Sequence, residues 1–510
     1  MRSRWSVGFV FSMLCLVTAL YSVKQVPDAR VIYSADFSLS NHWYRFEIEK
    51  TGIYNLTYSD LSSLPLADMD PRNIRIFTNG GALLNINSSE TGNPFLEIPL
   101  YIQGESDGTF HEEDRIIFYA ENRDSPNKNS SVSQTNNPYS GTCSYWLNFD
   151  GDYGYPPRRM EFLQAVSGEA ITTTEYLHSV HFEQENIRKT IDNFKWFSTK
   201  IHQGGNEAFS TDINIIDPVS SGAIQGIIEL SLEQSGDTSG IVNTINVENN
   251  GVSAFLQNWS AIQGYYISKS DFPLYSAVNN IKLELLSSNP VFLDYINLKY
   301  QRRFIKHQNE SYFIDIQQSD AGLNRCFRFE TDSEEELLVF QADNYSEAYL
   351  VPFVRESNGL SFTTDCKQVN ASYNIEPDYY IVSIENLLRV NQLSAYSPGE
   401  LSEIQPETDC FIITPDDFLS QSQTLAHLYS EFKGINSLII RLNDVFDTYN
   451  GGNPDPGAVR LYLKNSLRQL SKPESLQVIL IGSGTNDWRG FDQKSIPLNK
   501  MIVYQRGFIT

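Results

Sequence analysis

Cysteine and histidine are the residue types in this 510-residue chain that could supply a nucleophile or a metal site. Beyond the first twenty residues the cysteines are Cys143, Cys326, Cys366 and Cys410. No two have the C-x-x-C spacing of a zinc ribbon or finger. In an exported chain, four cysteines permit three disulfide pairings or free buried thiols, and both alternatives stay open. Because Cys410 is followed by the apolar run Phe-Ile-Ile, we interpret it as a core residue at a strand start rather than a nucleophile.

The histidines do not form a recognisable metal site either. His178 and His181 are the only close pair among the seven. Two residues three apart on a strand point to opposite faces, and no cysteine or acidic cluster joins them. His427 lies between Ala426 and Leu428 on an amphipathic stretch, where a surface or hydrogen-bonded histidine is expected.

Two short motifs offer ligand chemistry but lack the rest of a site. Asp150-Gly151-Asp152 has the carboxylates that calcium prefers, yet it lacks the remaining positions of an EF-hand loop, so an ordinary turn is favoured. Gly482-x-Gly484 lacks the third glycine of a nucleotide fingerprint, and the chain has neither a phosphate-binding P-loop motif nor a G-x-S-x-G elbow. From spacing alone we assign no catalytic residue, no metal ligand and no cofactor-binding residue, and we expect no cofactor.

Composition bounds the class of protein. The chain has 38 basic and 62 acidic side chains, a formal net charge of −24, which disfavours nucleic acid as a partner. Its 13% aromatic content, rich in Tyr and Phe, favours half-buried strands.

The first residues have the pattern of a targeting segment. Arg2 and Arg4 precede an apolar run over residues 7–21, which predicts a signal peptide over residues 1–19; an uncleaved signal anchor is the alternative. We therefore expect export to the bacterial periplasm, the outer membrane surface or the extracellular space.

Pattern changes along the chain predict a multidomain, mainly β protein followed by an α/β region. Alternating apolar runs predict an amino-terminal β domain over residues 30–150 and an antiparallel β-sandwich region over residues 223–400, joined by a connecting region over residues 151–222. Strand-like runs after residue 310 either continue the sandwich or form a small extra sheet. Residues 408–510 switch to the strand-helix alternation of a parallel sheet.

The α/β region is the part that should position a site. Strands are predicted at residues 410–414, 437–442 and 477–481, with two intervening helices. Asp416 or Asp417 is the expected cap of the first helix, Gly434 its end, and Asp455-Pro456 the start of the second. The third strand is apolar throughout, as in strands buried on both faces, and it leads into Gly482 at the edge where open α/β sheets place ligands. A sheet that stopped at this strand would expose an apolar edge.

Three segments of this region resemble the gingipain family of cysteine peptidases. They occur in the family order: Cys410-Phe-Ile-Ile-Thr, then Val445-Phe-Asp-Thr-Tyr-Asn-Gly-Gly-Asn-Pro-Asp-Pro-Gly-Ala-Val-Arg460, then Val478-Ile-Leu-Ile-Gly-Ser-Gly-Thr-Asn-Asp487. The preceding β domains resemble those of the sortase-like member of the type IX secretion system, in phrases such as Gly52-Ile-Tyr-Asn-Leu-Thr-Tyr-Ser-Asp-Leu61 and Asp294-Tyr-Ile-Asn-Leu-Lys-Tyr-Gln-Arg302. The resemblance spans residues 40–500. It implies a caspase-like peptidase domain, protein or peptide substrates, and secretion-system components as partners.

The departures from the family bear on activity. In the family a Gly-His-Gly segment and a later nucleophilic cysteine follow the third segment, and this chain has neither before Thr510. Ser483 also stands where the family has aspartate. A thiolate needs a base within hydrogen-bond reach, so the resemblance implies an exported homologue, linked to proteolysis and secretion, that is inactive as given. A truncated reading frame and a noncatalytic cell-envelope or surface binding or scaffold protein are the alternatives.

Overall fold

The computed structural model describes most of residues 37–503. The predicted signal peptide, Cys366 and the last seven residues lie outside the described residues. So do the internal segments 41, 63, 66–68, 85–94, 123–136, 165, 167–168, 190–194, 220–223, 236–240, 261–263, 308–311, 316–323, 332–334, 366–377 and 398–400.

Two facing sheets form the amino-terminal core. Their alternating apolar residues, such as Ile48, Leu56 and Phe118, are fully buried between them. One sheet has the order β28 (Ser394–Tyr396), β1 (Trp43–Ile48), β7 (Cys143–Asn148), β3 (Arg75–Thr78) and β4 (Leu96–Glu97). The other has the order β27 (Leu388–Arg389), β2 (Gly52–Thr57), β6 (Arg115–Ala120) and β5 (Leu100–Gln103). The strands β27 and β28 therefore pair with elements more than 300 residues earlier, across the predicted divisions at 150 and 223, which stay a prediction.

The second core is an antiparallel β-sandwich, as the sequence predicts for this part of the chain. Its first sheet has the order β12 (Thr199–Ile201), β19 (Val291–Arg303), β14 (Ile224–Gln234) and β17 (Gly264–Leu274), with β9 (Glu175–Glu183) also paired to β19. Its second sheet has the order β13 (Ala208–Ile215), β18 (Ala277–Leu285), β15 (Asn243–Asn249) and β16 (Val252–Trp259). A small hairpin, β10 (Ile187–Arg188) and β11 (Trp196–Phe197), extends from this sandwich.

A further pair of small sheets lies between these two cores, so the runs after residue 310 form extra sheets. One is β20 (Tyr312–Asp315), β26 (Asp378–Ser383), β22 (Leu337–Asn344) and β23 (Glu347–Leu350). The other is β24 (Val354–Glu356), β25 (Gly359–Asp365), β21 (Asn324–Glu330) and β8 (Ile171–Thr173). Phe327, Phe329 and Phe362 pack between them, whereas Phe340 and Tyr380 face the amino-terminal core.

The last region is α/β, and its three strands are parallel as predicted. The central strand β29 (Cys410–Thr414) lies between β30 (Ser437–Arg441) and β31 (Gln477–Leu480). Three α-helices accompany them: α1 (Leu419–Lys433), α2 (Leu442–Asn450) and α3 (Pro456–Ser466). The described 3-10 helices are η1 (Phe37–Leu39), η3 (Pro71–Asn73), η4 (Glu105–Asp107), η7 (Ile384–Asn386), η8 (Asp416–Phe418), η9 (Leu467–Gln469), η10 (Pro473–Ser475) and η11 (Ile496–Leu498). The predicted fold class, antiparallel β followed by a parallel α/β region, is confirmed.

Three details of the α/β prediction are wrong. The helix α2 was not expected; it begins directly after β30 without a side-chain cap. Asp416 and Asp417 lie in η8 and do not cap α1, because Asp416 pairs with Arg441 instead. The strand β31 is an edge strand, with Val478 41% and Leu480 50% exposed, while β29 is the strand buried throughout. Gly434 and the Asp455-Pro456 helix start are confirmed.

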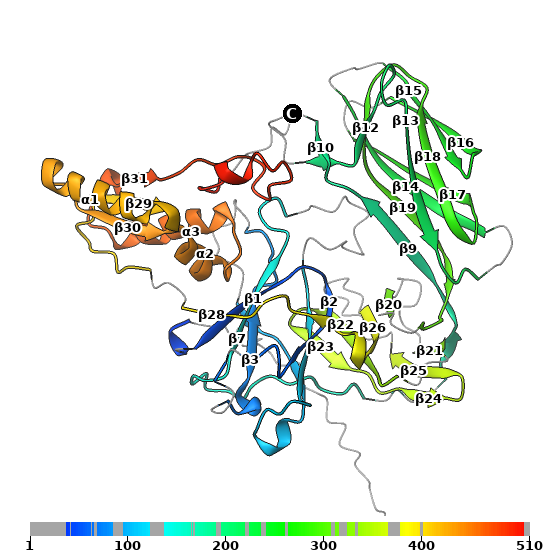
Figure 1. The fold of residues 1–510 in the computed structure, drawn as a ribbon, viewed down its shortest axis with the longest axis horizontal. Helices are drawn as coiled ribbons and strands as arrows, with labels where there is room; N and C mark the ends of the chain where they lie inside the picture. The colour runs from blue at the N-terminus through cyan, green and yellow to red at the C-terminus, as the bar shows by residue number, and fades with distance from the viewer. Residues whose placement is uncertain are drawn as a thin grey trace, which may run out of the picture.

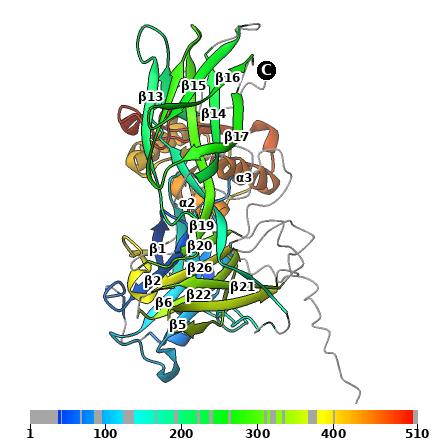
Figure 2. The ribbon, with the colours of Figure 1, turned by 90° about the vertical axis from the view of Figure 1, so that its right-hand side faces the viewer.

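The regions surround a shared centre rather than forming a row. Figure 1 shows the α/β region on the left and the β-sandwich on the right, with the amino-terminal sheets and the small sheets below. Figure 2 shows the sandwich strands rising above the amino-terminal and small sheets. In the described part of the chain, no helix is both long and apolar enough to span a bilayer.

Candidate functional site at the carboxyl edge of the parallel sheet

The carboxyl ends of β29, β30 and β31 meet at one edge, because the three strands are parallel. Open α/β sheets bind ligands at this edge. Thr414 ends β29, Arg441 ends β30, and Gly482 follows β31. These ends, with the segment that follows β31, form the candidate site.

Charged side chains connect the ends of β29 and β30. The Asp416 carboxylate accepts hydrogen bonds from Arg441 Nε at 2.7 Å and Asn443 Nδ2 at 3.0 Å. The hydrogen bond from Arg441 lowers the pKa of Asp416 below its usual value. Beside this pair is an open pocket of about 300 Å³, lined by Arg441, Asp444 and apolar side chains that include Leu419 and Ile439.

The two glycines after β31 serve a close chain crossing. Gly482 has φ +114°, a conformation that favours glycine. A Cβ at Gly484 would lie 2.1 Å from the carbonyl oxygen of Met501, so only glycine fits there. Between them, the Ser483 carbonyl accepts hydrogen bonds from the backbone N–H groups of Lys500 and Met501, each at 2.8 Å. Gly482-x-Gly484 thus builds a tight crossing and does not open a helix as a nucleotide motif would.

The segment after β31 has no helix or strand over residues 482–495, which we call the carboxyl-edge loop. The buried side chain of Asp487 accepts the hydrogen bonds that hold this loop in its conformation. The Asp487 carboxylate accepts hydrogen bonds from the N–H groups of Phe491 at 3.1 Å and Asp492 at 2.8 Å. Asn499 Nδ2 donates to the Asp487 carbonyl at 2.6 Å. Sequence reasoning noted Asp487 only through the family resemblance; its role is to close this loop.

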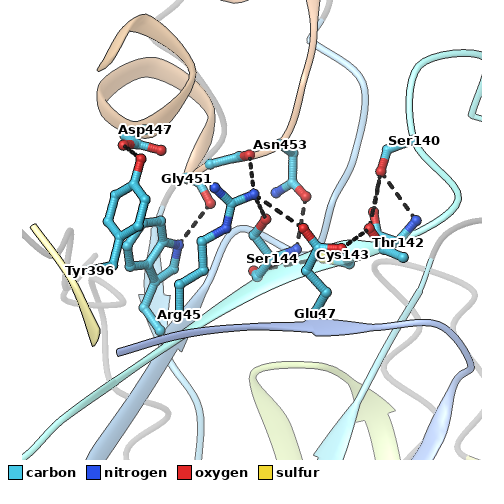
Figure 3. A network of polar contacts seen from close by, with 12 residues as sticks. Arg45, Glu47, Ser140, Thr142, Cys143, Ser144, Tyr396, Asp447, Gly451 and Asn453 are labelled. Carbon is cyan, nitrogen blue, oxygen red and sulfur yellow. Dashed lines mark hydrogen bonds and ion pairs between the residues drawn. The ribbon is translucent and has the colours of Figure 1, made fainter. Parts of the chain in front are cut away.

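The α/β region is docked on the amino-terminal sheet through the turn between α2 and α3. Asn453 Oδ1 accepts a hydrogen bond from the Ser144 N–H at 2.9 Å, and its amide donates to Asn79 at 2.9 Å. The Gly451 carbonyl accepts from Trp146 Nε1 at 2.9 Å. Figure 3 shows Arg45 of β1 and Ser144 of β7 directed at this turn. The family motif at residues 445–460 therefore includes a domain contact, which its polar sequence did not indicate.

An arginine and a buried carboxylate complete this contact. Arg45 donates to Ser144 Oγ at 3.0 Å and to the Gly452 carbonyl at 3.1 Å. The Tyr396 hydroxyl donates to Asp447 Oδ2 at 2.8 Å (Figure 3). Burial of Asp447 raises its pKa to about 6. The strand β28 and the helix α2 are thus joined through the carboxyl group of Asp447, whose pKa lies in the weakly acidic range.

The described cysteines and the Asp150-Gly151-Asp152 motif take structural positions outside the candidate site. Cys410 is fully buried at the amino-terminal end of β29, away from the carboxyl edge, and burial raises its thiol pKa. Among the described residues, the cysteines Cys143, Cys326 and Cys410 form no disulfide with one another. Asp150 accepts hydrogen bonds from Ser40 and Asn148, and lies 2.7 Å from His42 Nδ1.

The histidines are each placed apart. On β9, His178 lies 2.8 Å from the Tyr176 hydroxyl, and burial lowers its pKa to about 4. His181 instead lies 2.6 Å from Asn297 Oδ1 and 3.0 Å from Glu183. His427 is exposed on α1. Within the described residues, no three histidine, cysteine or carboxylate side chains converge as metal ligands would.

Comparison with known proteins places this arrangement. The model of peptidase family C25 matches residues 403–509. The crystal structure of dimeric latent PorU from Porphyromonas gingivalis superposes with a TM-score of 0.70 at 19% identity, over 89% of this chain and 43% of that chain. This chain therefore spans less than half the length of that relative. The gingipain resemblance read from the sequence is confirmed in the family match, and the chain has the fold of the part of PorU that it covers.

Other solved structures match only part of the chain. The carbohydrate-binding module CBM36 in complex with calcium and xylotriose matches at 15% identity and a TM-score of 0.19, over 23% of this chain and 98% of that chain. A family 35 carbohydrate-binding module from Clostridium thermocellum matches at 9% identity and a TM-score of 0.18, over 25% of this chain and 98% of that one. A search of curated proteins gave no match.

Proposed function

We propose that this chain is an exported, gingipain-type cysteine peptidase homologue directed at polypeptides, in which a β framework carries a peptidase-family α/β region. One observation supports this most directly. The residues that match peptidase family C25 are those that build the parallel sheet and its carboxyl-edge loop. They are set on a framework with the PorU fold.

In this proposal the carboxyl edge receives the polypeptide, and the described residues supply its walls. Asp416, Arg441 and the pocket beside them form one side, and the carboxyl-edge loop forms the other. The nucleophile and its base are not among the described residues at this edge. Cys410 cannot serve, because its buried thiol lies at the opposite end of β29 and its raised pKa disfavours the thiolate.

The proposed setting is the cell envelope. The signal-peptide pattern at residues 1–19 and the resemblance to the sortase-like member of the type IX secretion system support export and secretion-linked processing. Protein substrates and secretion-system components are the proposed partners. The strongly negative charge of the chain makes nucleic acid a poor partner.

The test uses the native protein from its source cells. Its carboxyl end is mapped by mass spectrometry, the nucleotide sequence after the codon for Thr510 is read, and hydrolysis of unfolded protein substrates is assayed. A continuation with Gly-His-Gly and a later cysteine, with hydrolysis abolished by iodoacetamide, supports the proposal. A native protein without these residues and without thiol-dependent hydrolysis contradicts it.

A noncatalytic envelope-binding role is the second candidate, and one surface favours it. On the outward face of the first sandwich sheet, Tyr266 is 46% exposed beside Glu229, and Lys299 Nζ lies 2.7 Å from the same carboxylate. An exposed aromatic ring framed by polar groups can hold a sugar ring. Retention of the purified chain by cell-wall polysaccharide, lost in Tyr266→Ala, would support this role; equal retention of both would contradict it.

A further inference from the structure

The carboxyl-edge loop is held from outside the α/β region as well as from within it. Within the α/β region, the loop is held by the hydrogen bonds to the Asp487 carboxylate and to the Ser483 carbonyl. One of its external contacts is with the β10–β11 hairpin, which belongs to the β-sandwich; another brings Arg489 close to Gly141 of the amino-terminal region. Arg188 Nη1 of this hairpin donates to Asn486 Oδ1 at 2.7 Å. Figure 1 shows β10 beside the carboxyl-terminal segment.

A stack of four side chains joins the hairpin to the loop. The rings of Trp196 and Phe491 lie 5.1 Å apart at 59°. The Arg188 guanidinium lies 4.9 Å from the Trp196 ring, and the Arg489 guanidinium lies 4.5 Å from the Phe491 ring. Trp196 is 8% exposed although its strand has only two residues. Aromatic pairs flanked by cations stabilise a contact beyond the apolar area that they bury.

The hairpin itself is firmly attached to the sandwich. Lys195 Nζ lies 2.9 Å from Asp294, and Lys189 Nζ lies 2.8 Å from Glu233. Phe197, next to Trp196, is fully buried and packs on Phe292 at 5.2 Å. A movement of the hairpin therefore requires a change in the sandwich, and the loop is coupled to the sandwich through Arg188 and Trp196, which contact Asn486 and Phe491.

We propose that Trp196 and Arg188 are positioning residues: they fix the carboxyl-edge loop, and through them the β-sandwich regulates the candidate site. The proposal rests on the proposed function in taking this edge as the polypeptide site. The loop has no helix or strand of its own, so its conformation depends on the side chains that hold it. An occupant of the sandwich that displaced the hairpin would loosen the loop.

Hydrogen exchange in the full chain tests this without any assay of activity. In Trp196→Ala, the amides of Phe491 and Asp492, which donate to Asp487, should exchange about five- to tenfold faster than in the wild type. Trp196→Phe keeps a ring at this position and should stay within about twofold of the wild type. Tyr266→Ala, on the same sandwich but outside the stack, should leave the loop amides unchanged.

The second variant is Phe491→Ala, which removes the ring from the loop side. It should accelerate exchange in the loop and also in the described strands of the hairpin, residues 187–188 and 196–197, while β14 and β19 stay protected. If Trp196→Ala also speeds exchange in β14, that variant has destabilised the sandwich itself, and the result for Phe491→Ala is the one that tests the proposal. Unchanged loop exchange in Phe491→Ala, or equal loosening by Trp196→Phe and Trp196→Ala, overturns the proposal. Faster exchange in a protein that binds no polypeptide would overturn the proposed function alone.

Discussion

The two sides of the parallel sheet contrast in what covers them. Next to β30, the turn between α2 and α3 is buried against β1 and β7 by hydrogen bonds to Asn453, Gly451 and Gly452. By contrast, the helix α1, which lies against β29 and β30, has Phe432 74% exposed, and the edge strand β31 has Leu480 50% exposed. An apolar strand therefore becomes core or edge according to what packs on it, and the docked side should carry most of the region's stability.

The largest expected effect compares a central with an edge strand residue. Phe411→Ala in β29 should lower the free energy of unfolding of the α/β region by about 3–4 kcal/mol, because a fully buried ring is removed. Val478→Ala in β31, paired with Phe411 but 41% exposed, should cost less than about 1 kcal/mol. Both losses are measured by unfolding the chain in urea and using limited proteolysis to monitor the unfolding of the α/β region. Equal losses would show that β31 is covered in solution.

A second comparison uses two glycines with positive φ. Gly452→Ala places a Cβ 2.9 Å from the Trp146 ring at φ +86°, and should cost about 2–3 kcal/mol. Gly434→Ala, at φ +64° after α1, has no atom within 4 Å of the new Cβ and should cost only about 1 kcal/mol. The difference in melting temperature between these variants reports the packing of the interface. No difference would mean that the turn is not docked on the amino-terminal sheet.

Asp447 makes the docked side sensitive to pH. Its folded pKa of about 6 lies above the ordinary value of 3.8 for aspartate, so its contribution to stability is full below about pH 4 and is lost as the pH rises through 6. Tyr396 and Arg45 face it from the amino-terminal sheet, and Asp444 and Arg441 from its own region. Asp447→Asn removes the buried charge and keeps an acceptor for Tyr396. It should therefore stabilise the chain by about 1–2 kcal/mol at pH 8 relative to the wild type, and by much less at pH 4.5. A gain that is independent of pH would contradict this assignment.

The elements with continuous apolar runs could be predicted from the sequence, and those defined by distant partners could not. The parallel strands and the Asp455-Pro456 helix start were recognised because their signals are local. The helix α2 was missed because it has no side-chain cap, although Leu442, Val445, Phe446 and Tyr449 have helical spacing. The spacing of these apolar residues was therefore the only local sign of α2 in the sequence.

The candidate site and its support were harder to predict, for a different reason. The pairing of β27 and β28 with β2 and β1 joins segments more than 300 residues apart, which no local pattern encodes. Asn79 and Asn453 belong to polar turn sequences, which give no local sign of burial; the structure buries them as partners of each other. The contact of Trp196 with Phe491 is likewise visible only in three dimensions.

The smallest expected effect concerns Cys410, which lies at the better covered centre of the sheet. Cys410→Ala should lower the free energy of unfolding by about 1 kcal/mol, because it leaves a small void where a fully buried sulfur packs. It should change no turnover, since residues 20–510 are expected to show no thiol-dependent peptidase activity: a thiolate is disfavoured where burial raises the thiol pKa. Cys326→Ala, at a partly exposed cysteine, is the matched control. Peptide hydrolysis by the purified chain that disappears in Cys410→Ala but persists in Cys326→Ala would show instead that this end of β29 opens to substrate.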